Sequence, residues 1–250
     1  MRHTRTTAIR RSSATAALLC SAVLLASGCS SGHASPKAEA TPPNDYGCLT
    51  PAQASAGSIT IDDDGTPLDA YVEGDGKVGI VFSHQLGSDL CEWLEYFPNF
   101  TKRGYRLIAF TMNDADPASV LAAARELIHR GSQKVVLVGG SKGGTASLAA
   151  AGNPGQVNVA GVVSLSSPQQ FGGTNALAAA GKLKVPAFFA AESNDSPYVD
   201  DIRGLYKADH DSDKVLKVYD GMNHGVSILR DGTALADVTS FVERYAPAAG

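Results

Sequence analysis

Ser141 is the residue whose setting most clearly indicates chemistry. It lies in the run GGSKGG (residues 139–144), directly after the apolar run KVVLVG and at the start of KGGTASLAAA. A strand that turns sharply into a helix lifts a serine hydroxyl above a sheet, and glycines flank such a turn because a Cβ atom there would collide with neighbouring backbone. The following helix N-terminus offers N–H groups to an oxyanion. The pattern predicts a nucleophilic serine.

The same glycines match neither of two common phosphate-binding motifs. In the dinucleotide-binding pattern GxGxxG the middle glycine would fall on Ser141, and a Walker A loop needs a GK[ST] ending that is missing at the required spacing. A glycine-rich packing turn without chemistry is the remaining alternative.

A serine hydroxyl is a weak nucleophile alone and needs a base, which an acid must orient. Three histidines are candidates for the base. His129 ends a predicted helix and His210 lies in a charged turn, whereas His224 follows the last predicted strand, residues 215–219. We therefore predict that His224 is the base.

Asp195 is the predicted acid because it follows the strand predicted at residues 185–191. It could instead be a turn residue only, and Glu192, Asp200 and Asp201 are rivals. Ser141, Asp195 and His224 all follow the carboxyl ends of predicted strands. Open α/β sheets place their sites at this edge.

The elements that would hold these residues alternate between strand and helix. Apolar β-branched runs predict parallel strands covered on both faces, and the helical runs between them predict a doubly wound, mostly parallel α/β sheet. We expect one domain over residues 58–250. Strands are predicted at residues 58–61, 68–72, 78–83, 105–110, 134–139, 159–165, 185–191 and 215–219, and helices at 90–103, 117–130, 142–151, 174–181, 198–208 and 232–245.

With the order serine, aspartate, histidine, the chain resembles the α/β-hydrolase family over roughly residues 58–246. The family commonly has His-Gly after the strand before its first helix, with a Trp about nine residues on. His84 and Trp93 keep that spacing, and Gln85 stands where the glycine is usual. We expect His84 to be structural, bonding loop carbonyl groups.

The resemblance implies an oxyanion hole formed by the backbone N–H groups of Leu86 and Lys142. It further implies hydrolysis of carboxylic ester or thioester bonds through an acyl-serine, without a metal or organic cofactor. Only about 20 residues separate the strands predicted at 159–165 and 185–191, which leaves no room for a large lid. This is similar to small dienelactone-hydrolase-type members and favours small ester substrates.

Two other functions stay open. An acyltransferase would use the same three side chains with an alcohol acceptor, and a catalytically silent domain would serve as an anchored binding module. Binding to nucleic acid is not expected. Four of the 21 basic residues lie within residues 1–28, so the remainder holds 17 basic against 25 acidic residues.

The N-terminus predicts export. Four arginines precede a short apolar run at residues 14–26, which is typical of a signal peptide over residues 1–28. The sequence LLASGCSS resembles a bacterial lipobox, which implies lipidation of Cys29 and anchoring on the outer face of the cell membrane; plain secretion is the alternative. Residues 29–57 are rich in Ser, Ala and Pro and predict a flexible tether.

Cys48 and Cys91 then remain, and an oxidising compartment favours a disulfide between them over two buried thiols. Metal sites are not expected. The chain has no CxxC pair, and Lys214 stands where the acidic run at 209–213 would need glycine to form a calcium loop.

Overall fold

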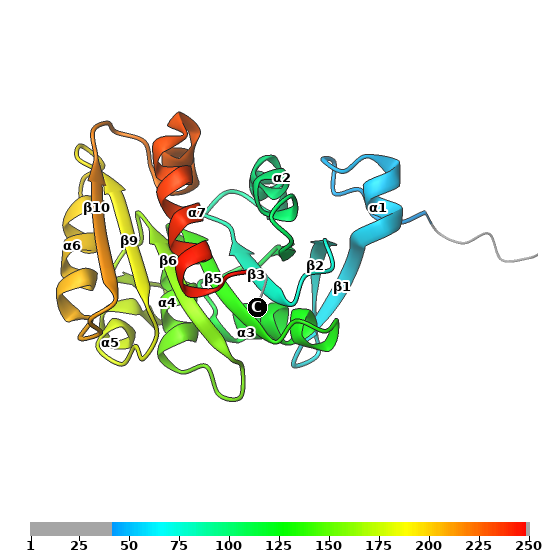
Figure 1. Ribbon diagram of the computed structural model, residues 1–250, viewed down its shortest axis with the longest axis horizontal. Helices are drawn as coiled ribbons and strands as arrows, with labels where there is room; N and C mark the ends of the chain where they lie inside the picture. The colour runs from blue at the N-terminus through cyan, green and yellow to red at the C-terminus, as the bar shows by residue number, and fades with distance from the viewer. Residues whose placement is uncertain (1–41, 249–250) are drawn as a thin grey trace, which may run out of the picture. The chain divides into compact units, whose positions relative to one another are not determined.

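The computed structural model describes residues 42–248, and these form one α/β unit (Figure 1). Its main strands are β1 (Ser58–Asp63), β2 (Thr66–Glu73), β3 (Val78–Ser83), β4 (Arg106–Phe110), β5 (Lys134–Gly140), β6 (Val159–Leu165), β9 (Ala187–Glu192) and β10 (Lys214–Tyr219). They lie in one sheet in the order β1-β2-β4-β3-β5-β6-β9-β10. β2 pairs antiparallel with β1 and β4, and every other neighbouring pair is parallel. The predicted doubly wound, mostly parallel sheet is confirmed.

Helices cover both faces of this sheet (Figure 1). One face is buried under α3 (Pro117–His129), α4 (Lys142–Gly152), α5 (Ala176–Ala180) and α6 (Tyr198–Ala208). The other is buried under α2 (Phe97–Thr101), α7 (Thr233–Tyr245) and two 3-10 helices, η1 (Leu90–Tyr96) and η2 (Gly225–Asp231). No helix in residues 42–248 has the length and apolar character needed to cross a membrane.

Strand β5 shows why its sequence is apolar throughout. Val135 and Leu137 pack into the core on one face, and Val136 and Val138 pack into the core on the other. Successive side chains of a strand point to opposite faces, so a strand covered on both sides has no solvent-facing position for polar residues. β5 is thereby fixed at the centre of the sheet, with Ser141 directly beyond its end.

Helix α3 begins and ends where local chemistry requires. The Asp116 side chain accepts a hydrogen bond from the Ala118 N–H, and Pro117 occupies the first turn, where its missing N–H costs nothing. Gly131 follows the helix with φ +102°, a conformation that favours glycine. The helix therefore begins at the predicted residue.

The prediction of one α-helix over residues 90–103 is wrong. The structure has η1 followed by the short α2, with Pro98 at the start of α2. Proline has no N–H to bond the carbonyl four residues earlier and its ring clashes with that carbonyl, which kinks or breaks an α-helix at this position. The sequence prediction also missed η2 and a small hairpin, β7 (Gln170–Phe171) with β8 (Thr174–Asn175).

The last part of the expected tether is folded. Helix α1 (Pro51–Gly57) begins with a capping box in which Thr50 and Gln53 satisfy each other's backbone N–H groups. The Cys48–Cys91 disulfide, confirmed here, ties this segment to η1. The boundary at residue 57 is therefore too late, because small residues without an apolar period form a helix when capped and cross-linked. The expected signal segment and Cys29 lie outside the described residues.

Candidate active site

Ser141 lies at the sharp turn between β5 and α4, and its backbone is held at φ +49°. Such a conformation is costly for a residue with a Cβ atom. Two glycines allow the close approach of the chain around it. A Cβ atom on Gly139 would lie 2.3 Å from the Gly143 carbonyl oxygen, and one on Gly143 would lie 2.1 Å from the Ser83 carbonyl oxygen. The geometry is that of a nucleophile elbow.

His224 bridges Ser141 and Asp195. Its Nε2 lies 2.8 Å from Ser141 Oγ, and its Nδ1 lies 3.0 and 3.1 Å from the two carboxylate oxygens of Asp195. With Nδ1–H donating to the carboxylate, Nε2 is left to accept the serine proton. The three predicted residues, far apart in the sequence, form one continuous hydrogen-bonded chain.

The rival carboxylates are occupied elsewhere. Buried Glu192 accepts hydrogen bonds from the backbone and side-chain amide of Asn223. Exposed Asp200 pairs with Arg203 at 2.9 Å. The Asp201 carboxylate faces the Gln169 backbone, and burial raises its pKa. Asp195 is the carboxylate that the fold places against the imidazole.

The two expected oxyanion donors come from two different segments, the start of α4 and the loop after β3. Lys142 N–H belongs to the first turn of α4, where backbone donors have no intrahelical acceptor. Leu86 belongs to the loop after β3 and lines the same cavity as Ser141. Within residues 42–248 neither N–H is engaged by another protein group. Both are therefore available to a ligand oxygen.

The Lys142 side chain is buried and binds backbone rather than a carboxylate. Its Nζ donates to the carbonyl oxygens of Met112 at 2.9 Å and Asn113 at 3.1 Å. Burial lowers the pKa of this ammonium group, while the charges of Asp114 and Glu92 oppose that shift. The lysine thus fastens the loop after β4 to the start of α4.

His84 is also buried and binds backbone groups on both ring nitrogens. Nδ1 lies 2.8 Å from the Gln85 carbonyl oxygen, and Nε2 accepts from the Met112 N–H at 3.0 Å. Burial, with a smaller contribution from Lys142, lowers the pKa of His84 to about 4. The ring joins the loop after β3 to the loop after β4, in keeping with the expected structural role.

Two aromatic residues at the site were missed from the sequence. The Tyr198 ring packs on the His224 imidazole, with ring centroids 4.2 Å apart. Phe171 reaches the site from the β7–β8 hairpin. The position of Tyr198, three residues after Asp195, was the available signal for the first; nothing in the spacing of Phe171 indicates its place.

A cavity of about 250 Å³ opens at the serine. It is lined by Gln85, Leu86, Ser141, Pro168, Phe171, Tyr198 and His224. Leu86, Pro168, Phe171 and Tyr198 give it largely apolar or aromatic walls, and Ser141 and His224 are the reacting groups in its lining. A cavity of this size and lining suits a small, largely apolar acyl or alkyl group.

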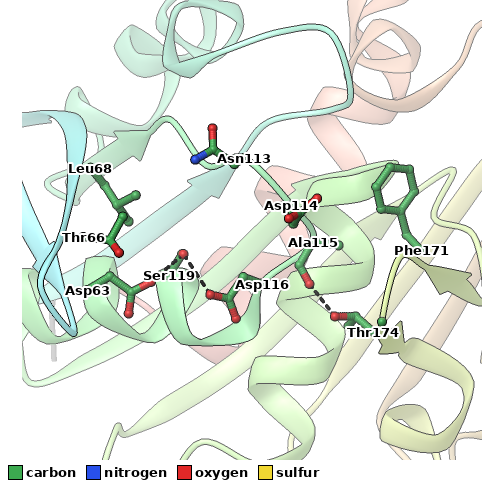
Figure 2. Close-up of a pocket in the computed structure, with 11 residues that line it drawn as sticks. Asp63, Thr66, Leu68, Asn113, Asp114, Ala115, Asp116, Ser119, Phe171 and Thr174 are labelled. Carbon is green, nitrogen blue, oxygen red and sulfur yellow. Dashed lines mark hydrogen bonds between the residues drawn. The ribbon is translucent and has the colours of Figure 1, made fainter.

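A second cavity, of about 320 Å³, is lined by the loop after β4 (Figure 2) and shares Phe171 with the first. Carboxylates of Asp63, Asp114 and Asp116 line it. Figure 2 shows Ser119 between Asp63 and Asp116, with its hydroxyl 2.7 Å from Asp63 Oδ2. In the part of the chain that the structure describes, no three His, Cys, Asp or Glu side chains are grouped closely enough to hold a metal ion.

Comparison with known proteins identifies the fold. No protein-family model matches the chain, and no curated protein matches it in sequence. Several solved structures are similar to the chain. An esterase of Pyrococcus furiosus has a TM-score of 0.65 and 16% sequence identity, and the match covers 75% of this chain and 90% of the esterase. A dienelactone hydrolase of Anabaena variabilis has a TM-score of 0.59 and 17% identity, covering 75% of this chain and 94% of the hydrolase. A bromoperoxidase of Bacillus anthracis has a TM-score of 0.61 and 13% identity, covering 74% of this chain and 99% of the bromoperoxidase.

The chain therefore has the α/β-hydrolase fold, in a single domain. Identities this low establish the fold and leave the reaction open, since one fold hosts many activities. The names of the similar structures illustrate this, because a bromoperoxidase stands among esterases. The function must be argued from the site.

Proposed function

We propose that the protein is a serine hydrolase that cleaves carboxylic ester or thioester bonds through an acyl-serine intermediate. One observation carries the proposal: His224 Nε2 lies 2.8 Å from Ser141 Oγ at a strained elbow, while Asp195 holds the opposite ring nitrogen. A serine hydroxyl gains nucleophilic strength from such a base, and the acid fixes the tautomer that can accept the proton.

In the first half of the reaction, Ser141 Oγ bonds to the substrate carbonyl carbon and its proton passes to His224 Nε2. The carbonyl oxygen becomes an oxyanion, which the N–H groups of Leu86 and Lys142 stabilise. Asp195 stabilises the imidazolium. When the tetrahedral intermediate collapses, the bond to the leaving oxygen or sulfur breaks and the imidazolium proton goes to that atom.

In the second half, water attacks the acyl-serine and gives its proton to His224. Collapse of the second intermediate releases the carboxylic acid and returns the proton to Ser141 Oγ. The cavity beside Ser141, at about 250 Å³, favours acetyl to butyryl esters over long acyl chains.

A fluorophosphonate probe and a series of p-nitrophenyl esters test the proposal. The wild-type protein should be labelled on Ser141 and should hydrolyse short-chain esters. Ser141→Ala should not be labelled, and its kcat for these esters should fall by at least about 10⁴-fold. Ser212→Ala is the matched control, because Ser212 is exposed and does not line the cavity at Ser141. Folded wild-type protein that neither labels nor hydrolyses any ester would show that the proposal is wrong.

We also propose that the enzyme is exported and anchored to the outer face of the membrane through a lipid on Cys29, and acts there on small esters. The Cys48–Cys91 disulfide supports an oxidising compartment. Mass spectrometry of the mature N-terminus tests this. A diacylated Cys29 that disappears in Cys29→Ala supports anchoring, and an unmodified N-terminus shows secretion instead.

A further inference from the structure

Gln85 binds in three directions at the edge of the site. Its backbone N–H donates to Glu92 Oε1 at 2.7 Å, its carbonyl oxygen lies 2.8 Å from His84 Nδ1, and its side-chain Oε1 accepts from the Val226 N–H at 3.2 Å. This residue stands where the resembling family usually has glycine. A glycine could make the two backbone contacts but not the one to Val226.

The contact to Val226 fixes the side-chain amide. A backbone N–H can only donate, so the oxygen of the amide must face Val226. Val226 lies in the first turn of η2, where backbone N–H groups lack an acceptor within the helix, and it is two residues after His224. Gln85 therefore caps the helix that continues directly from the base.

Gly225 is shaped to receive this side chain. It has φ +60°, and a Cβ atom there would lie 2.2 Å from Gln85 Oε1 and 3.6 Å from Ser141 Cβ. The Gln85 amide, the Gly225 backbone and the elbow thus occupy one closely packed space. A side chain at 225 would displace Gln85.

We propose that Gln85 is a positioning residue, which locks the loop carrying the Leu86 N–H against the segment carrying His224. The inference rests on the proposed function, in which these two groups act on the same tetrahedral intermediate. Leu86 follows Gln85 directly, and Val226 is two residues after His224. The Gln85–Val226 hydrogen bond therefore fixes the distance between the oxyanion donor and the base. Displacing groups of this kind by about 1 Å can cost on the order of 100-fold in rate.

The role predicts a particular kinetic signature. Gln85→Met keeps the length of the side chain and removes its acceptor. We expect kcat per active site to fall about 10- to 100-fold, with KM within about threefold, because the lost alignment matters mainly in the transition state. Affinity for phenylboronic acid, which forms a tetrahedral adduct with the serine, should fall in parallel with kcat/KM. Gln156→Met, an exposed position on another loop, is the matched control.

Active sites are titrated with the fluorophosphonate, so a variant that merely folds poorly shows fewer sites with unchanged kcat per site. That result overturns the inference, as does a boronate affinity equal to that of wild type. If the wild-type protein is inactive, the proposed function is wrong. If the wild type is active and Gln85→Met has the same kcat and boronate affinity, the proposed function stands and only the inference about Gln85 is wrong.

A double-mutant cycle gives a second test. Gly225→Ala should lower kcat more with Gln85 present than in a Gln85→Gly background, where no side chain is displaced. The strain of alanine at φ +60° is the same in both backgrounds and cancels. Additive effects on kcat would contradict the inference.

Discussion

The ring of Tyr198 lies against the imidazole of His224, with centroids 4.2 Å apart and planes tilted by 47°. Tyr198 is the first residue of α6, so the segment that presents Asp195 to one edge of the imidazole also covers one of its faces. The base is held by a hydrogen bond and by an aromatic contact from the same stretch of chain.

Replacing Tyr198 should loosen the base without removing it. Aromatic pairs contribute about 0.5–1.5 kcal/mol beyond burial, so Tyr198→Leu should lower kcat about three- to tenfold. Tyr198→Phe keeps the ring and should stay within about twofold of wild type. Tyr206→Leu, on the same helix but packed on Phe189, is the control. Equal kcat in Tyr198→Leu and wild type would show that the contact has no catalytic role.

Asp195→Asn should leave the fold intact and reverse the preferred tautomer of His224. An amide NH₂ facing Nδ1 forces the ring proton to Nε2, which then cannot accept the Ser141 proton; the expected loss in kcat is about 10⁴-fold. Steady-state hydrolysis of p-nitrophenyl acetate measures it. Asp200→Asn, at an exposed position on α6, should be nearly neutral. A variant Asp195→Asn with a tenth of wild-type activity would rule out this role.

The main strands and their mostly parallel arrangement could be predicted because the central strands, such as β3 and β5, are continuous apolar runs, and helices such as α3 have their own period and caps. Ser141, Asp195 and His224 could be predicted for the same reason: each follows the end of a recognisable strand. Their convergence is a consequence of parallel strands ending at one edge of the sheet.

What could not be predicted are contacts between segments that no local pattern relates. Gln85 and Val226 are separated by 141 positions, and their hydrogen bond depends on how two loops lie against each other. Pro98 is visible in the sequence, but where η1 ends and α2 begins depends on how this segment packs on the sheet. Helix α1 has a capping box in its sequence, yet its small residues show no apolar face.

The Cys48–Cys91 disulfide should stabilise the fold measurably. It closes a loop with a sequence separation of 43, and cross-links of this length contribute about 2–4 kcal/mol by restricting the unfolded chain. Unfolding in urea with and without reductant measures the difference, and Cys48→Ser/Cys91→Ser should match the reduced wild type. A midpoint that reductant does not move would contradict the prediction.

His84 should make stability depend on pH. Burial lowers its folded pKa to about 4 from an unfolded value near 6.5, so between these values the unfolded chain holds a proton that the folded chain does not. The contribution is fully present above about pH 6.5 and is lost as pH falls toward 4, by roughly 3 kcal/mol in all.

Urea unfolding at several pH values measures this dependence. In His84→Gln the additional loss between pH 6.5 and 4 should be absent, whatever its absolute stability, whereas His129→Gln, at a side chain 84% exposed, should keep the wild-type slope. Parallel curves for wild type and His84→Gln would show that this histidine does not titrate as argued.

Phe171 lines both the cavity at Ser141 and a second cavity, lined by Asp63, Asp114 and Asp116 and drawn in Figure 2. Phe171→Ala should open one into the other, because no other side chain contributes to both linings among the described residues. The acidic cavity would then become reachable from the nucleophile, and it should favour a positively charged acyl group.

The measurement compares two p-nitrophenyl esters of equal shape, one whose acyl chain ends in a trimethylammonium group and one ending in its neutral tert-butyl isostere. The ratio of their kcat/KM values should rise about fivefold in Phe171→Ala, corresponding to about 1 kcal/mol of attraction at these partly hydrated carboxylates. The gain should shrink at high salt and in Phe171→Ala/Asp114→Asn, since both weaken the same charge interaction. A ratio that stays at the wild-type value would mean that Phe171 does not separate the two cavities.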